Sequence, residues 1–138
     1  MKIFRGFHRT GLAPACALTI GNFDGVHRGH QAMLALLGNE ARMRGVPSCV
    51  LTFEPHPRDY FAAALRRPEL APARIGTLRD KLSELERCGV DQVVVQPFNA
   101  ALASLSSIAP SNSTTTAVRF RPSSKVSSAR WPANIAAS

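Results

Sequence analysis

The sequence predicts an α/β domain in which helices cover a parallel sheet. Short apolar runs that suit buried strands alternate with segments of helical periodicity, and glycines end the two clearest helices at Gly45 and Gly89. Strand–helix–strand units of this length form right-handed crossovers between parallel strands. Since such sheets bind ligands at the carboxyl ends of their strands, we expect the chemistry in the loop that follows the first strand.

The first half of the chain contains two predicted strands and one helix. Residues 15–20 (ACALTI) form a short apolar run closed by Gly21, which is typical of a buried strand. A helix is predicted from Arg28 or Gly29 to Arg44, and residues 46–53 (VPSCVLTF) form the second strand. The predicted apolar face of the helix consists of Met33, Leu36, Leu37 and Ala41.

The second half is less regular at first and then returns to the same pattern. Four prolines limit regular structure over residues 54–76, although a short helix is expected at 59–65. Thr77 and Asp80 resemble a capping box at the start of a helix, residues 90–95 form a third strand, and another helix starts at 99–105. If the sheet holds only these three strands, residues 93–95 (VVV) lie on an exposed edge.

The net charge of +8 divides into two unrelated parts. Residues 1–106 contain 13 basic and all 9 acidic residues, whereas residues 107–138 contain four basic residues and no acid. The body shows no basic stripe with interleaved aromatics, so we expect no nucleic-acid partner. The absence of a long apolar run and of a signal peptide, with three widely spaced cysteines, indicates a cytoplasmic protein without membrane attachment.

The segment GNFDGVHRGH (residues 21–30) places three glycines, two histidines and one aspartate between the first strand and its helix. Glycine permits backbone conformations and close approaches that a side chain blocks. The start of the helix offers N–H groups and the positive end of its dipole, which suit phosphate. His27 and His30, three residues apart, can face the same anion, so the pattern predicts a site for phosphoryl or nucleotidyl transfer.

The residues of this loop also allow other interpretations. An HxxH pair can bind metal, but a structural zinc needs four ligands, and no Cys or His has suitable spacing, so no metal site is predicted. Neither GxGxxG nor GxxxxGK[ST] occurs. A further alternative is that the glycines only turn the chain and the histidines start the helix by chance.

Residues 19–31 (TIGNFDGVHRGHQ) resemble the nucleotide-binding motif of the bacterial FMN adenylyltransferases, or FAD synthetases. These form the N-terminal module of bifunctional riboflavin kinase/FMN adenylyltransferases, and HRGH matches the HxGH element of the wider nucleotidyltransferase superfamily. Residues 51–61 (LTFEPHPRDYF) resemble the flavin-side segment of the same family. The resemblance covers about residues 12–105 and implies a Rossmann-like HxGH nucleotidyltransferase fold, three-layered around a parallel sheet and incomplete here.

The resemblance implies transfer of AMP from ATP to FMN, giving FAD and pyrophosphate with Mg²⁺ assisting. His27 and His30 would be the catalytic residues, stabilising phosphate charge without a covalent intermediate. The implied ATP-binding residues are Gly21, Asn22, Phe23, Asp24, Gly25, His27, Gly29 and His30. The implied FMN-binding residues are Phe53, Pro55, His56, Pro57, Arg58 and Phe61.

Physical reasons support the flavin-side assignment. The prolines stiffen the loop, His56 or Arg58 could meet the FMN phosphate, and Phe53 and Phe61 could present an aromatic face to the isoalloxazine ring. For the two phenylalanines, packing in the core is an equally good interpretation.

The family pattern stops near Ser106. Its later GxDFRFG-like and SSTxIR-like loops, and the riboflavin kinase module, do not follow, and Ser/Thr/Pro/Arg-rich sequence takes their place. We therefore expect a partial domain at residues 1–105, a disordered tail at 106–138, and a truncation or reading-frame shift that impairs activity. The alternatives are a nucleotide- or flavin-binding fragment without turnover and another HxGH adenylyltransferase. The oligomeric state is not predicted.

Overall fold

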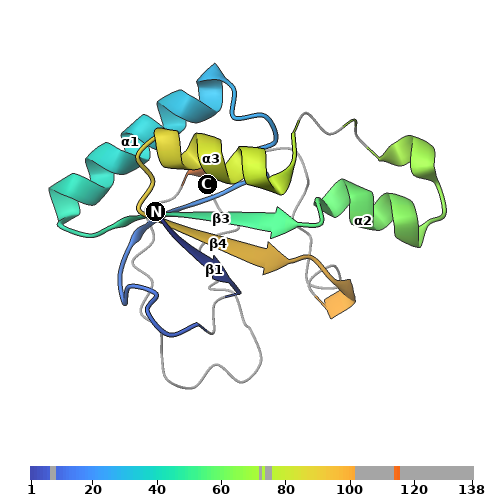
Figure 1. Cartoon of the computed structure of the whole chain (residues 1–138), viewed down its shortest axis with the longest axis horizontal. Helices are drawn as coiled ribbons and strands as arrows, with labels where there is room; N and C mark the ends of the chain where they lie inside the picture. Colours follow the sequence, from blue (N-terminus) through green and yellow to red (C-terminus); the bar gives the residue numbers. More distant parts are fainter. Residues whose placement is uncertain (7–8, 72, 74–75, 102–113, 116–138) are drawn as a thin grey trace.

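The computed structural model describes residues 1–6, 9–71, 73, 76–101 and 114–115 (Figure 1). Strands and helices alternate along most of this range, as the sequence predicts. The elements are β1 (Lys2–Arg5), β2 (Ala17–Ile20), α1 (Arg28–Arg44), β3 (Ser48–Glu54), α2 (Pro57–Ala64), a 3-10 turn η1 (Pro68–Leu70), α3 (Leu78–Arg87), β4 (Gln92–Pro97) and β5 (Thr114–Thr115).

The strands form one sheet in the order β1-β4-β3-β2-β5. The first four are parallel, and β5 pairs antiparallel with β2. The longest pairing joins β3 to β4, from Cys49 opposite Gln92 to Glu54 opposite Pro97. The predicted α/β fold with a parallel sheet is therefore confirmed.

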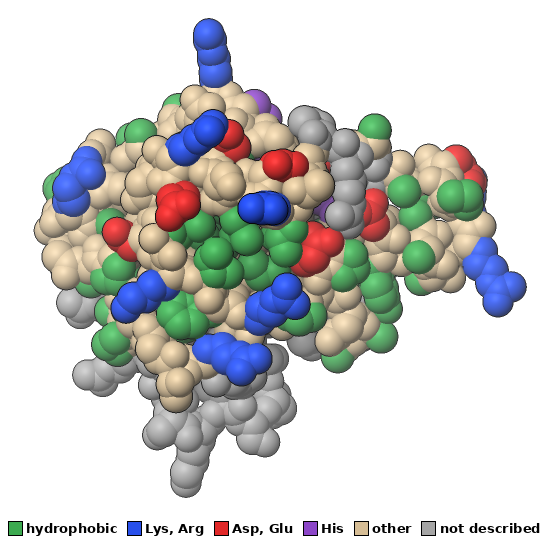
Figure 2. Space-filling view, in the orientation of Figure 1, with side chains coloured by type: hydrophobic (Ala, Val, Ile, Leu, Met, Phe, Trp, Pro, Cys, Tyr) green, Lys and Arg blue, Asp and Glu red, His purple; other side chains and the backbone are tan. Residues whose placement is uncertain are grey.

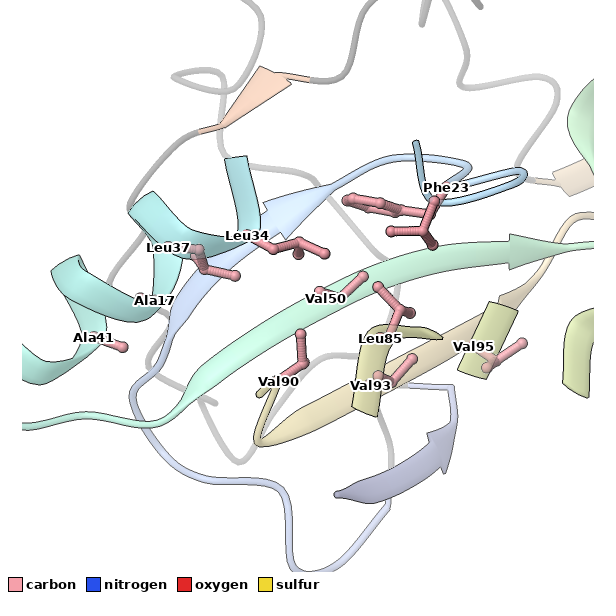
Figure 3. Packing of buried hydrophobic residues seen from close by; sticks show 11 residues of the cluster. Ala17, Phe23, Leu34, Leu37, Ala41, Val50, Leu85, Val90, Val93 and Val95 are labelled. Carbon is pink, nitrogen blue, oxygen red and sulfur yellow. The ribbon is translucent and has the colours of Figure 1, made fainter. Parts of the chain in front are cut away.

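Helices α1 and α3 lie over the same face of the sheet, while α2 follows the carboxyl end of β3 (Figure 1). The core beneath α1 and α3 is a set of buried apolar residues contributed by the sheet, both helices and the loop after β2 (Figure 3). Its members are Ala17, Phe23, Val26, Leu34, Leu37, Ala41, Val50, Leu85, Val90, Val93 and Val95. Phe23 is therefore an anchor that ties the predicted ATP-side loop, residues 21–30, to the core.

Residues of β3 alternate between the two faces, as a pleated strand requires. Val50 packs with the α1 and α3 core, whereas Cys49, Leu51 and Phe53 belong to a second apolar cluster. That cluster also includes Phe98, with Phe4 and Tyr60 packed against it. Phe53 consequently points to the face opposite the one that α1 covers.

The bounds of α1 agree with the prediction, but its buried face is rotated. Leu34, Leu37 and Ala41 are buried and Met33 packs against them, whereas Leu36 is 65% exposed. Leu36 was therefore wrongly assigned to the core face. The helix ends at Gly45, whose φ of 63° is the left-handed conformation that glycine adopts without strain.

The prediction of a three-stranded sheet with an exposed edge at residues 93–95 was wrong. The strand β1 was not predicted, and it pairs with β4 from Lys2 opposite Gln92 to Arg5 opposite Val95. Lys2–Arg5 is short and carries charges at both ends, so it lacks the apolar run of a buried strand. The pairing places β4 between β1 and β3.

The prediction for residues 106–138 lies outside the described residues, apart from the two that form β5. The helix expected at 99–105 is described only at Ala100 and Ala101, which are helical. The short helix expected at 59–65 is confirmed and begins two residues earlier, at Pro57.

Candidate active site

The predicted ATP-side loop leaves the carboxyl end of β2 and is fixed by contacts with β3. The Gly21 N–H donates to the Leu51 carbonyl at 3.0 Å, and the Thr52 hydroxyl donates to the Asn22 carbonyl at 3.1 Å. A Cβ added at Gly21 would lie 2.9 Å from the Phe23 ring, so a side chain there would displace the loop's anchor. Phe23 itself is 1% exposed and has a φ of 49°.

His27 and His30 meet at the start of α1. His27 is the N-cap: its Nδ1 accepts the backbone N–H of His30 at 3.3 Å. The two imidazoles stack with ring centroids 3.8 Å apart and planes 16° apart. A neutral imidazole that accepts at Nδ1 carries its proton on Nε2, so His27 retains a donor for an anion near the helix start.

Gly29 is required by this arrangement. A Cβ at residue 29 would lie 3.1 Å from Cε1 and 3.2 Å from Nδ1 of His27. Those contacts are tighter than ordinary van der Waals spacing, so an alanine there would push the imidazole away from the His30 N–H. The glycine of HxGH thus permits the stacked pair.

Burial lowers the pKa of His30, and the nearby charge of His27 lowers it further. The His30 ring lies 5.0 Å from the buried Phe23 ring, which accounts for part of its apolar surroundings. Its Nδ1 is buried and has no hydrogen-bond partner among the described residues, and the same holds for Asn22 Oδ1. Buried polar atoms of this kind are candidates for contact with a ligand.

The predicted flavin-side segment, residues 51–61, runs from the last residues of β3 into α2. Pro55 follows Glu54, Pro57 opens α2, and His56 caps that helix by accepting the Arg58 N–H on Nδ1 at 3.1 Å. Burial lowers the pKa of His56, while the charges of Asp59, Lys81, Asp24 and Arg58 also act on it. This segment lies against the ATP-side loop, since the Thr52 hydroxyl donates to the Asn22 carbonyl and the Gly21 N–H to the Leu51 carbonyl.

The two predicted flavin-contacting aromatics meet around a third ring, that of Phe98. The Phe53 and Phe61 rings lie 5.9 and 5.7 Å from the Phe98 ring, and Tyr60 joins them at 5.3 Å. Phe53 is buried, whereas Phe61 is 40% exposed. Phe61 and the exposed Arg58 remain accessible from solvent, while Phe53 packs in the second apolar cluster.

A pocket of about 280 Å³ adjoins the loop on the α3 side. Asp24 and Gly25 line it together with Val26, Gly76, Thr77, Asp80, Lys81 and Glu84. Lys81 and its partner Thr52 were not predicted from the sequence to belong to the site. A charged residue on the apolar stripe of Leu78, Leu82 and Leu85 was the available signal for Lys81.

Within the described ranges, no three His, Cys, Asp or Glu side chains gather to hold a metal ion. Figure 2 shows acidic and basic side chains interspersed around the apolar side chains in the middle of the visible face. Among the helices that the structure describes, none has the length and apolar character needed to cross a bilayer.

A parallel sheet with an HxGH element at the start of the first crossover helix defines a nucleotidyltransferase-like α/β fold. The chain belongs to the FAD synthetase family, whose model matches residues 11–113. This match ends beyond residue 105, where the sequence analysis placed the end of the domain.

Curated relatives described as bifunctional riboflavin kinase/FMN adenylyltransferases match the same region. The Escherichia coli K12 protein is 49% identical over 107 residues, which cover 76% of this chain and 33% of that protein. The Pseudomonas fluorescens protein is 50% identical over 109 residues, covering 77% and 32%. The chain thus spans about a third of the length of these relatives.

A similar fold occurs in a Streptococcus pneumoniae crystal structure described as a macrolide-efflux protein. The TM-score is 0.60 at 26% identity, and the match covers 75% of this chain and 34% of that one.

Proposed function

We propose that this chain transfers AMP from ATP to FMN, producing FAD and pyrophosphate. The observation that carries the proposal is the His27–His30 pair at the start of α1, in a chain of the FAD synthetase family. The relatives' names include FMN adenylyltransferase, which favours FMN over the acceptors of other HxGH enzymes.

In this proposal, a phosphate oxygen of FMN attacks the α-phosphorus of ATP. The new P–O bond forms as the bond to the β-phosphate oxygen breaks, and pyrophosphate leaves. An FMN phosphate is already ionised at neutral pH, so the protein needs no general base and acts by positioning and by stabilising charge. His27, His30 and the start of α1 supply donors to the phosphates of ATP.

The remaining loop residues shape the nucleotide site. Gly21 and Gly29 leave room for Phe23 and His27 respectively, and Gly25 has a φ of 56°, which favours glycine. We place the flavin at the end of β3, against Pro55, His56, Pro57, Arg58 and Phe61, with Phe53 supporting it from the second cluster.

We propose that Mg²⁺ arrives bound to the phosphates of ATP, since Mg²⁺ commonly binds through substrate phosphates and one or two carboxylates. Asp24, which lines the pocket beside the loop, is a carboxylate that fits this role.

ATP and FMN are then the anionic partners, rather than nucleic acid. Three free cysteines fit a reducing cytoplasm.

The experiment is to incubate the purified chain with FMN, ATP and Mg²⁺ and to measure FAD, while ATP and FMN binding are titrated separately. We expect FAD at a rate well below that of a full-length relative, because the chain spans a third of such a protein. His27→Ala or His30→Ala should abolish it, whereas Arg42→Ala at the far end of α1 should not.

The second candidate is a nucleotide- or flavin-binding fragment without turnover, which the same one-third coverage favours. Binding of both ligands without FAD would support this candidate over the first. FAD formation that persists in both histidine variants would refute the proposed roles of the pair.

A further inference from the structure

Lys81 is a charged residue on the face of α3 that packs against the sheet. Its exposed fraction is 9%, and its helical neighbours Leu78, Leu82 and Leu85 all pack on or in the main core. Lysine is seldom buried this deeply unless its ammonium group is paired, because desolvation of the charge is costly.

Two hydrogen bonds link the Lys81 ammonium to the ATP-side loop, with the Thr52 hydroxyl between them. Lys81 Nζ donates to Thr52 Oγ1 at 3.3 Å, and Thr52 Oγ1 donates onward to the Asn22 carbonyl at 3.1 Å. Thr52 is fully buried, so this series of two hydrogen bonds, Lys81–Thr52–Asn22, is shielded from competing water. Lys81 also lines the same pocket as Asp24.

The charge of Lys81 reaches the flavin-side segment as well. It lowers the pKa of His56, in opposition to Asp59 and Asp24, which raise it. Lys81 is therefore a buried cation beside both the ATP-side loop and the end of β3.

We infer that Lys81 is a positioning residue that fixes the ATP-side loop relative to the flavin-side segment through the series Lys81–Thr52–Asn22. The inference rests on the proposed function. The ammonium orients the Thr52 hydroxyl, which in turn holds the backbone of Asn22, the residue between Gly21 and the anchored Phe23. A lysine needed only for packing could be replaced by methionine with little consequence.

The test uses the full chain and measures dissociation constants for MgATP and FMN. We expect Lys81→Met and Thr52→Val each to weaken ATP binding by about tenfold, the effect of losing a buried hydrogen bond to a charged group. The double variant should be no weaker than Lys81→Met alone, because both changes break one series. Arg79→Met, an exposed position of the same helix, is the matched control and should bind as the unmutated chain does.

The second readout is the titration of His56, followed by NMR in each variant. Lys81→Met should raise the His56 pKa, because the charge that lowers it is gone, while Asp59, Asp24 and Arg58 remain. Thr52→Val and Arg79→Met should leave it unchanged. If Lys81→Met does not fold, as judged by thermal unfolding, Thr52→Val still tests the link, because it keeps the charge and removes only the hydroxyl.

The outcomes separate the two claims. An unmutated chain that binds neither ATP nor FMN would overturn the proposed function and this inference together. An unmutated chain that binds ATP, with Thr52→Val and a folded Lys81→Met binding equally well, would overturn the inference alone. Additive losses in the double variant, or an unchanged His56 titration in Lys81→Met, would also overturn it.

Discussion

The surroundings of His30 favour its neutral imidazole over the charged form. Burial and the charge of His27 both lower its pKa from the usual value near 6.5, so His30 is neutral at pH 7 in the ligand-free protein. A bound polyphosphate would favour the protonated form and raise this pKa. Under the proposed function, His30 would therefore gain charge when the polyphosphate binds, which suits stabilisation of a phosphoryl transition state.

The lowered pKa of His30 predicts how stability depends on pH. Between the folded-state pKa and about 6.5 the unfolded chain binds more protons than the folded chain, so the free energy of unfolding falls as pH drops through this interval. The lowered pKa of His56 acts in the same direction. We expect a lower unfolding midpoint at pH 5 than at pH 8, measured by circular dichroism.

His30→Asn and His56→Asn should each flatten that pH dependence, because each removes one titrating group. Arg79→Met, which lies at an exposed position of α3, should leave it unchanged. A midpoint that rises between pH 8 and pH 5 in the unmutated chain would contradict the assigned direction of both shifts.

The proximity of candidate site residues was predictable from the sequence where one short segment contains all of them. Gly29, His27 and His30 are such a case, because a helix cap and the glycine beside it are local. Lys81 and Thr52 were not, because their pairing joins residues 29 apart in the chain and depends on how α3 lies over β3. Phe98 was missed for the same reason, because the aromatic rings that it contacts lie on other elements, Phe53 on β3 and Phe61 on α2.

At the scale of elements, helix ends were more predictable than helix faces. Both ends of α1 and the capping box of α3 follow from local chemistry, namely the histidine cap, the glycine at the end, and the Thr77–Asp80 pair. The buried face of α1 follows from where the sheet lies. The apolar pattern alone was consistent with Leu36 inside, but the helix presents Leu34 instead.

The capping box predicts a measurable part of the stability of α3. Thr77 Oγ1 accepts the Asp80 N–H at 3.2 Å, and the Asp80 carboxylate accepts the Thr77 N–H at 2.8 Å. Thr77→Ala should lower the free energy of unfolding by about 1 kcal/mol, since the Asp80 N–H loses its side-chain acceptor. Urea unfolding measures the change.

Ser83→Ala is the matched control for the cap, because Ser83 is exposed within the same helix. It should change stability by less than about 0.5 kcal/mol. Equal losses in Thr77→Ala and Ser83→Ala would show that the cap contributes nothing specific. Because α3 carries Lys81, weakened ATP binding in Thr77→Ala would also link the cap to the site.

At the scale of the whole molecule, the parallel sheet unites the two candidate segments. The ATP-side loop follows β2, and the flavin-side segment includes the carboxyl end of β3. These neighbouring strands are parallel, so both segments lie at the same edge. The parallel sheet and the place of the ATP-side loop at its carboxyl edge were predicted from strand–helix–strand spacing. The full strand order was not, because β1 precedes the family-like region and carries no apolar run.

The position of β1 makes the last prediction a test of the assembled sheet. Deleting residues 1–6 removes the partner of β4 and the packing of Phe4 on the second cluster. It should cost about 1.5–3 kcal/mol, the value of burying one large apolar side chain, and leave the backbone of Val93–Val95 open to pairing with another chain. We expect a lower unfolding midpoint and light scattering that grows with protein concentration.

Ile3→Thr is the control for this deletion. Ile3 is 51% exposed, so the substitution changes an outward side chain of β1 and keeps the strand's backbone pairing with Val93. This variant should remain monodisperse and should unfold close to the unmutated midpoint. If the deleted chain behaves like Ile3→Thr, β4 does not need β1 at its side, and the edge at Val93–Val95 is protected by its own twist or its neighbours. If only the deleted chain aggregates, the N-terminal strand is what separates the apolar centre of the sheet from intermolecular pairing.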